Sequence, residues 1–148
     1  MSITIEKFLI IGPKEIELIY PLYCKLFDPA HPIDTLIERC REKEKYLLLV
    51  AMSNGSPVGL KAAMAEDNLL HSWIGGVLPE FRRQGIARQL TEIQHEWAKE
   101  NGFSRIRTHT DHRYNNMIIH NIRNGFEIIE TKIRPHNGVR KIVMVKEL

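Results

Sequence analysis

Residues 75–88 have the residue types and spacing of a backbone site for phosphate groups. An expected strand runs into a tight loop, and the loop opens a long expected helix. The first turn of a helix carries N–H groups without intrahelical acceptors and a partial positive charge, so it attracts anions. Gly85 and Ala87 are too small to keep a pyrophosphate away from those amides. The glycine patterns of dinucleotide and nucleoside-triphosphate loops are absent, which points to another phosphorylated ligand.

The same segment resembles the central motif of the GNAT superfamily of N-acetyltransferases. The family pattern Q/R-x-x-G-x-G/A reads here as Arg82, Gly85 and Ala87 at the same spacing. A later stretch, residues 115–126, is similar to the second cofactor segment of the family and ends in its typical Gly-Phe pair. The order of the expected elements also fits the family over nearly the whole chain.

The resemblance implies acetyl-CoA as the acyl donor and a primary amine, on a small molecule or a peptide, as the acceptor. It also implies that the strand before the loop parts from its neighbour and that the pantetheine arm lies in the gap. Glycines inside a strand are themselves a sign of close approach by another group. The expected cofactor-binding residues are Gly75, Gly76, Val77, Arg82, Arg83, Gln84, Gly85, Ile86, Ala87, Arg88, Asn115 and Asn116.

Acetyl transfer needs a group that accepts the proton of the amine and hydrogen-bond donors for the oxyanion. Family members often have an acidic residue early in the strand before the loop, and His71 stands at that spacing. An imidazole titrates near neutral pH, so we expect His71 to take the proton directly or through water. Glu66 and Asp67 are the neighbouring alternatives. A backbone N–H near Val77 is expected to face the oxyanion.

The second cofactor segment departs from the family pattern at two places. Many members have a tyrosine there that protonates the leaving thiolate, and counting back from Gly125 and Phe126 places Asn121 at that position. An amide cannot act as an acid, so Asn121 is expected only to orient the sulfur. Tyr114, the nearest phenol, stands where an asparagine is often found. The missing phenol leaves a non-catalytic coenzyme A sensor module on the same fold as the alternative function.

The order of the elements predicts one domain over residues 1–148 with an α+β fold. With the resemblance, it predicts a GNAT-like, mixed and mostly antiparallel twisted sheet flanked by helices on both faces. The strand over residues 69–78 should be central and should part from the strand over residues 105–110 near its end.

Composition and charge restrict the partners that we expect. The chain is 43% hydrophobic and 26% charged with a net charge of +3, which is ordinary for a globular protein. The basic residues are scattered, so we expect no nucleic-acid partner. No apolar run is long enough for a membrane span and no signal peptide is recognisable, which indicates no membrane partner and a cytoplasmic location. A homodimer is left open.

Residues 109–112 combine two histidines with an aspartate and could in principle bind a metal ion. No third or fourth ligand stands at a suitable spacing, so we predict a solvated loop and no metal site. Trp73 is interpreted as a core residue or as part of a pocket wall.

Overall fold

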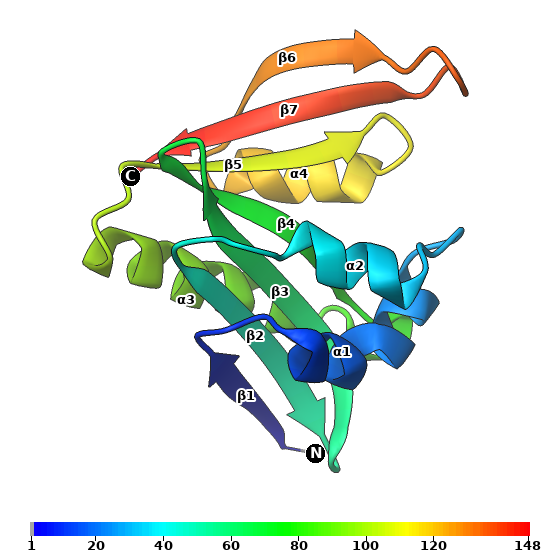
Figure 1. Ribbon diagram of the computed structural model, residues 1–148, viewed down its shortest axis with the longest axis vertical. Helices are drawn as coiled ribbons and strands as arrows, with labels where there is room; N and C mark the ends of the chain where they lie inside the picture. Colours follow the sequence, from blue (N-terminus) through cyan, green and yellow to red (C-terminus); the bar gives the residue numbers. More distant parts are fainter. Residues whose placement is uncertain (1) are drawn as a thin grey trace.

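Seven strands form one continuous sheet in the computed structural model, which describes residues 2–148 (Figure 1). The order in the sheet is β1-β2-β3-β4-β5-β7-β6. This architecture confirms the predicted mixed, mostly antiparallel sheet. Along the chain the elements are β1 (Ile3–Phe8), α1 (Pro13–Leu26), α2 (Ile33–Arg39), β2 (Tyr46–Ser53), β3 (Ser56–Glu66), β4 (Leu69–Val77), the 3-10 turn η1 (Pro79–Phe81), α3 (Ile86–Glu100), β5 (Arg105–Asp111), α4 (Asn115–Arg123), β6 (Glu127–Ile133) and β7 (Arg140–Glu147).

The β4 strand divides the sheet. It pairs with β3 along its whole length in antiparallel register. With β5 it pairs in parallel and only through three residue pairs, from Leu70 with Ile106 to Ser72 with Thr108. Beyond Ser72 the two strands part, which confirms the gap expected between residues 69–78 and 105–110. A register shift at Ala62 and Ala63 leaves Trp73 without a pairing partner on β3.

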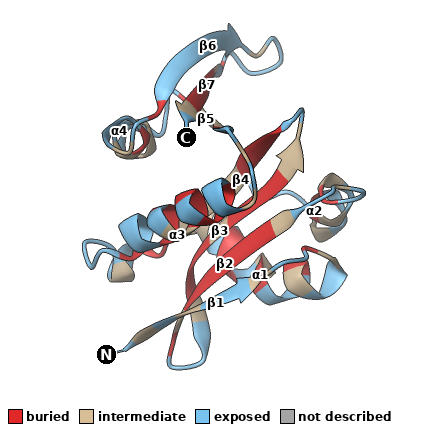
Figure 2. Ribbon diagram, turned by 90° about the vertical axis from the view of Figure 1, so that its left-hand side faces the viewer, coloured by how far each residue is buried: buried red, intermediate tan, exposed pale blue. Residues whose placement is uncertain are grey.

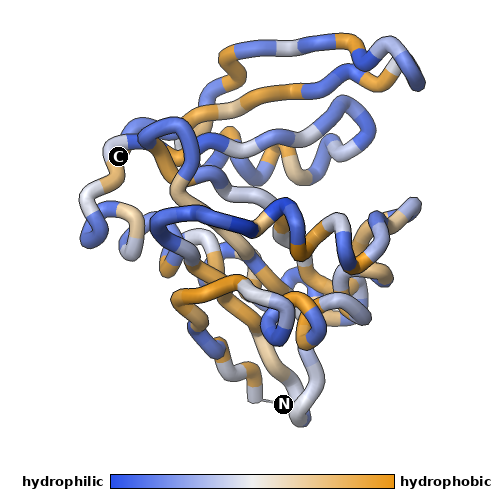
Figure 3. Tube along the Cα trace, viewed as in Figure 1, coloured by the Kyte–Doolittle hydropathy of each residue, from blue (hydrophilic) through white to orange (hydrophobic). Residues whose placement is uncertain are grey.

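Helices cover both faces of the sheet, as predicted. Figure 2 shows α1 and α2 on one face and α3 and α4 on the other. Five consecutive β2 residues, from Leu47 to Ala51, are fully buried because this strand is covered on both sides. In Figure 3 the helices alternate between hydrophilic and hydrophobic residues, the pattern of helices with one face on the core. No helix in residues 2–148 has both the length and the hydropathy needed to cross a bilayer.

Local turn chemistry fixes several boundaries. Asn54 and Gly55 both have positive φ, at 51° and 78°, and join β2 to β3 as expected for an Asn-Gly hairpin. The long helix α3 ends at Asn101, and Gly102 follows in the left-handed region at 81°.

One boundary differs in a way that matters for the site. Strand β5 continues to Asp111, where we predicted a solvated loop over residues 109–112. His109 and Thr110 lie within the strand predicted over residues 105–110, and that prediction is confirmed for them. The solvated loop is wrong there and at Asp111, because β7 supplies a partner for all three residues. The three side chains therefore alternate between the two faces of the sheet.

Candidate functional site

The N-terminus of α3 offers free amides to the solvent. Gly85 precedes the helix in the left-handed region at φ 80°, and the first backbone bond of the helix runs from Gln89 N–H to Gly85 O at 3.0 Å. The N–H groups of Ile86, Ala87 and Arg88 thus lack intrahelical acceptors. The helix has no side-chain cap and no acidic residue in its first turn. Its partial positive charge is therefore available to an anionic ligand.

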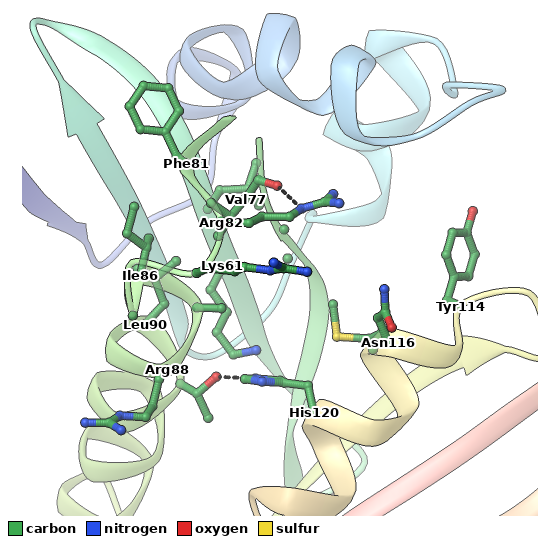
Figure 4. A pocket seen from close by; sticks show the side chains of 18 of the residues that line it. Lys61, Val77, Phe81, Arg82, Ile86, Arg88, Leu90, Tyr114, Asn116 and His120 are labelled. Atoms are coloured by element: carbon green, nitrogen blue, oxygen red, sulfur yellow. Dashed lines mark hydrogen bonds between the residues drawn. The ribbon is translucent and has the colours of Figure 1, made fainter. Parts of the chain in front are cut away.

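A cavity of about 760 Å³, which we term the outer cavity, opens between this helix start, β4 and α4 (Figure 4). All the predicted cofactor-binding residues line it except the exposed Gln84. Its wall contains no carboxylate, although five cationic side chains contribute to it. Such a wall fits a ligand with several negative charges. The cations are Lys61, Arg82, Arg83, Arg88 and Arg113.

Close packing favours glycine at Gly76 of β4, whereas a Cβ on Gly75 would meet its neighbours at ordinary contact distances. A Cβ on Gly76 would lie 3.0 Å from Leu26 Cδ1 at the end of α1. A Cβ on Gly75 would lie 3.4 Å from Leu60 O and 3.6 Å from Cγ of Lys61, the residue that pairs with Gly75 on β3. Just after the strand, Arg82 Nε–H donates to Val77 O at 3.0 Å and so ties the loop to the strand end.

A smaller cavity of about 200 Å³, the inner cavity, occupies the parting between β4 and β5. Its wall joins Trp73 of β4, His109 of β5 and Asn121 of α4, and the end of α1 closes one side through Phe27. It shares part of its wall with the outer cavity, including Lys61 and both β4 glycines. The two cavities are therefore neighbouring parts of one cleft, and Val77 borders only the outer part.

The predicted base, His71, lies behind the wall of the inner cavity rather than in it. The side chain is buried on β4, and its Nδ1 accepts a hydrogen bond from Arg107 Nε–H at 3.2 Å. Burial first, then the nearby His109 and Arg107, lower the pKa of His71 to about 3. The imidazole is therefore neutral at physiological pH.

His109 stands between His71 and the inner cavity. Its ring meets the His71 ring edge-on, and its own side chain lines the cavity. Burial first, then the charges of Lys141 and Arg107, lower the pKa of His109 to about 4. This imidazole is thus also neutral near pH 7 and has a free face toward the cleft.

The alternative bases Glu66 and Asp67 are held in ion pairs. The Glu66 carboxylate contacts Arg39 at 2.7 Å, Lys43 at 3.0 Å and Arg107 at 2.9 Å, and Asp67 contacts Arg107 at 3.0 Å. Burial would raise the pKa of Glu66, but the hydrogen bonds from Arg39 and Lys43 outweigh it and lower this pKa to about 2. Neither residue lines a cavity.

The predicted residues of α4 border the cleft at different depths. Asn115 and Asn116 line the outer cavity at the exposed start of the helix. Asn121 is buried, lines the inner cavity, and donates from Nδ2 to Met144 Sδ at 3.7 Å. Tyr114 touches both cavities, yet it is 40% exposed and Figure 4 shows its ring directed away from the floor of the cleft.

Several side chains of the cleft were not predicted from the sequence, and three of them bear on its chemistry. They are His109, Lys61, and His120, whose Nε2 lies 3.1 Å from Thr91 Oγ1 across the space between α3 and α4. The strand predicted over residues 105–110 already contains His109, and its alternation places His109 on the same face as Arg107. Within residues 2–148, no three potential metal ligands gather at one place.

Comparisons with known proteins agree with this geometry. The family model described as "Acetyltransferase (GNAT) family" matches residues 16–126. A search of curated proteins by sequence gives no match. Among solved structures, Ard1 from Thermoplasma volcanium has a TM-score of 0.83 at 18% identity and covers 100% of this chain and 99% of its own.

Two further structures show the same fold. The ribosomal-protein-S18-alanine N-acetyltransferase from Escherichia coli has a TM-score of 0.82 at 15% identity, covering 99% of this chain and 94% of its own. The PaiA N-acetyltransferase from Thermoplasma acidophilum, solved in complex with coenzyme A, has a TM-score of 0.72 at 15% identity and covers 100% of both chains. At such identities the likeness concerns the fold.

Proposed function

This chain belongs to the acetyltransferase (GNAT) family, whose members use acetyl-CoA, and we propose that it transfers the acetyl group directly to a primary amine. The observation that carries the proposal is the cleft itself. An anion-binding helix start leads through a cationic outer cavity into a small inner cavity between two parting strands. This arrangement suits a long ligand that has phosphates at one end, for the outer cavity, and a reactive group at the other, for the inner cavity.

The chain's own residues would hold the cofactor by its charge and by its backbone groups. The amides of Ile86, Ala87 and Arg88 face the pyrophosphate, and the exposed side chains of Arg82 and Arg83 add positive charge. Backbone groups of β4 from Gly75 to Val77 pair with the pantetheine arm. When bound, acetyl-CoA supplies an activated thioester carbonyl. The backbone N–H groups of Gly75 and Val77, which point away from β3, are the donors that we propose for the oxyanion.

The proton of the amine leaves through His109, and His71 holds His109 in position. The inner cavity has no carboxylate in its wall, and His109 is its neutral imidazole. We propose that His109 touches the amine and accepts its proton, directly or through water. His71 lies behind His109 and keeps the His109 ring in position. The hydrogen bond from Arg107 in turn fixes the ring of His71. Asn121 orients the sulfur from the α4 side of the same cavity.

The acceptor is proposed to be a small-molecule or peptide amine. The Escherichia coli relative is named for acetylating an alanine of a ribosomal protein, so peptides with a free N-terminus belong in the test set. The experiment is thiol release from acetyl-CoA with amines, polyamines, amino acids, aminoglycosides and peptides, followed by mass spectrometry of the product. Coenzyme A binding without transfer to any acceptor would instead support a sensor module, the function that the missing phenol at Asn121 favours.

A further inference from the structure

Lys61 places an ammonium group on the floor of the cleft with no carboxylate beside it. The side chain lies across Gly75, where an added Cβ would be 3.8 Å from Lys61 Nζ. It lines the outer and the inner cavity, and Figure 4 shows it running across the cleft toward His120. Neither cavity wall contains an acidic residue that could neutralise it.

The groups that share a cavity wall or a charge interaction with Lys61 include no carboxylate. Thr91 and His95 come from α3, His120 from α4 and Arg82 from the loop. After burial, the charge of Lys61 is among the causes that lower the pKa values of His95 and His120. Burial lowers the pKa of Lys61 itself to about 8. An ammonium in such surroundings is destabilised until an anion joins it.

The position of Lys61 indicates which anionic group of the cofactor, the pyrophosphate or the sulfur, would pair with it. The pyrophosphate already has the free amides of α3 and the exposed arginines at the mouth of the outer cavity. Lys61 borders both cavities, and it shares the wall of the inner cavity of about 200 Å³ with Arg82, Asn121 and His109. The charge that arises in the inner cavity is the one left on the sulfur by acyl transfer.

We propose that Lys61 is the counter-ion of the coenzyme A sulfur and serves as the proton donor that Asn121 cannot be. This inference rests on the proposed function. As the bond from the amine nitrogen to the acyl carbon forms, the bond from that carbon to sulfur breaks and its electron pair stays on sulfur. Lys61 Nζ–H hydrogen-bonds the thiolate and passes it a proton, while the amine loses its own proton to His109. Both side chains then recover their protonation states from water.

The test measures the ionisation of the bound product rather than turnover. Coenzyme A is bound to the wild type and to Lys61→Met, and the ultraviolet absorbance of the thiolate is followed as a function of pH. In the wild type, a cation within about 4–6 Å should lower the pKa of the bound thiol by about one unit or more, a tenfold gain in ionisation. In Lys61→Met the bound thiol should titrate at or above the value of free coenzyme A.

A second probe separates the sulfur from the rest of the ligand. Calorimetry with desulfo-coenzyme A, which lacks the thiol, should give the same affinity for wild type and Lys61→Met within about twofold, because no thiolate is present to pair. Lys61→Gln serves as a second neutral variant. Thermal unfolding is the control that should show both Lys61 variants to be folded. In Arg88→Met, the affinities for coenzyme A and desulfo-coenzyme A should fall together, with the thiol pKa as in the wild type.

Three outcomes would overturn the inference in distinguishable ways. An unchanged thiol pKa in both Lys61 variants shows that the sulfur has another partner. An equal loss of affinity for both probes in these variants assigns Lys61 to the phosphates or the pantetheine arm. Failure of the wild type to bind either probe defeats the proposed function, and the inference falls with it.

Discussion

The imidazole rings of His71 and His109 meet at 61°, with 4.7 Å between their centroids. Only His109 lines the inner cavity, whereas His71 accepts a hydrogen bond from Arg107 behind it. The two rings thus differ in their access to the cleft. One can touch a ligand in the cleft, and the other can only hold its neighbour in place.

Replacing His109 with alanine should lower kcat/KM by about 10²-fold or more, the usual scale for loss of a general base. The loss should shrink at high pH, where more of the amine is already deprotonated. His71→Ala should reduce kcat by a smaller factor and retain the wild-type pH profile, because it changes the position of His109 and not its chemistry. A pH series of kcat and KM for both variants checks this. An equal loss in His71→Ala, with an altered profile, would show that His71 itself accepts the proton.

Replacing Gly85 should weaken coenzyme A binding according to the side chain introduced. Gly85 has a φ of 80°, a region that β-branched residues avoid and asparagine tolerates. Gly85→Val should therefore lower the affinity severely, by about tenfold or more, because it both strains the loop and covers the amides of α3. Gly85→Asn should lower it less. Calorimetry on folded variants is the measurement, and equal affinities for wild type and Gly85→Val would remove the pyrophosphate from this loop.

Replacing Glu66 with glutamine should destabilise the fold, because Arg39, Lys43 and Arg107 lose their common anion. The pKa of Glu66 falls from 4.5 to about 2 on folding. Such a shift corresponds to roughly 3 kcal/mol of stability, present above the ordinary pKa and lost as pH falls toward the lowered one. Urea unfolding near pH 7 and near pH 3 should show the wild type and the variant converging in acid.

Glu38 provides the matched control for Glu66. It pairs with Arg41 at 3.2 Å, but the Glu38 and Arg41 side chains are 70% and 67% exposed. An exposed pair of this kind contributes little, so Glu38→Gln should stay within about 0.5 kcal/mol of the wild type. If the two variants were equally destabilised, the Glu66 cluster would have no special role in the fold.

The buried histidines should make stability fall as the solution is acidified. The pKa of His71 is lowered from 6.5 to about 3 in the folded state, so the unfolded chain binds this proton more readily between these values. The stability that neutral His71 contributes is therefore fully present above pH 6.5 and declines as the pH falls below that value. His71→Asn should reduce the slope of unfolding free energy against pH by up to about 1.4 kcal/mol per unit. Denaturant unfolding between pH 7 and pH 5, above the range where Glu66 titrates, measures this slope.

The fold and the uncapped start of α3 after Gly85 could be predicted because their signals are local. Asn54 with Gly55 specifies a hairpin, and Gly85 before an amphipathic helix specifies an exposed helix start. Which side chains of β3 and β5 face the cleft depends instead on pairing between strands that are distant in sequence. His109 faces the cleft because of its register with β7, and a shift of one residue would have turned it to the other face. Lys61 reaches the cleft because its partner across the strands is Gly75, a pairing that the register shift in β3 also influences.

The parting of β4 and β5 also bears on how the molecule moves. Three residue pairs join β1–β4 to the remaining strands, aided by contacts such as Thr91 with His120 from helix to helix. A cofactor in the cleft would touch β4 on one side and α4 on the other. It would occupy the gap that opens between β4 and β5 beyond Ser72. It would therefore couple the opening motions of the two parts. Amide hydrogens of β5, β6 and β7 that contact no ligand should then exchange more slowly with solvent once coenzyme A is bound.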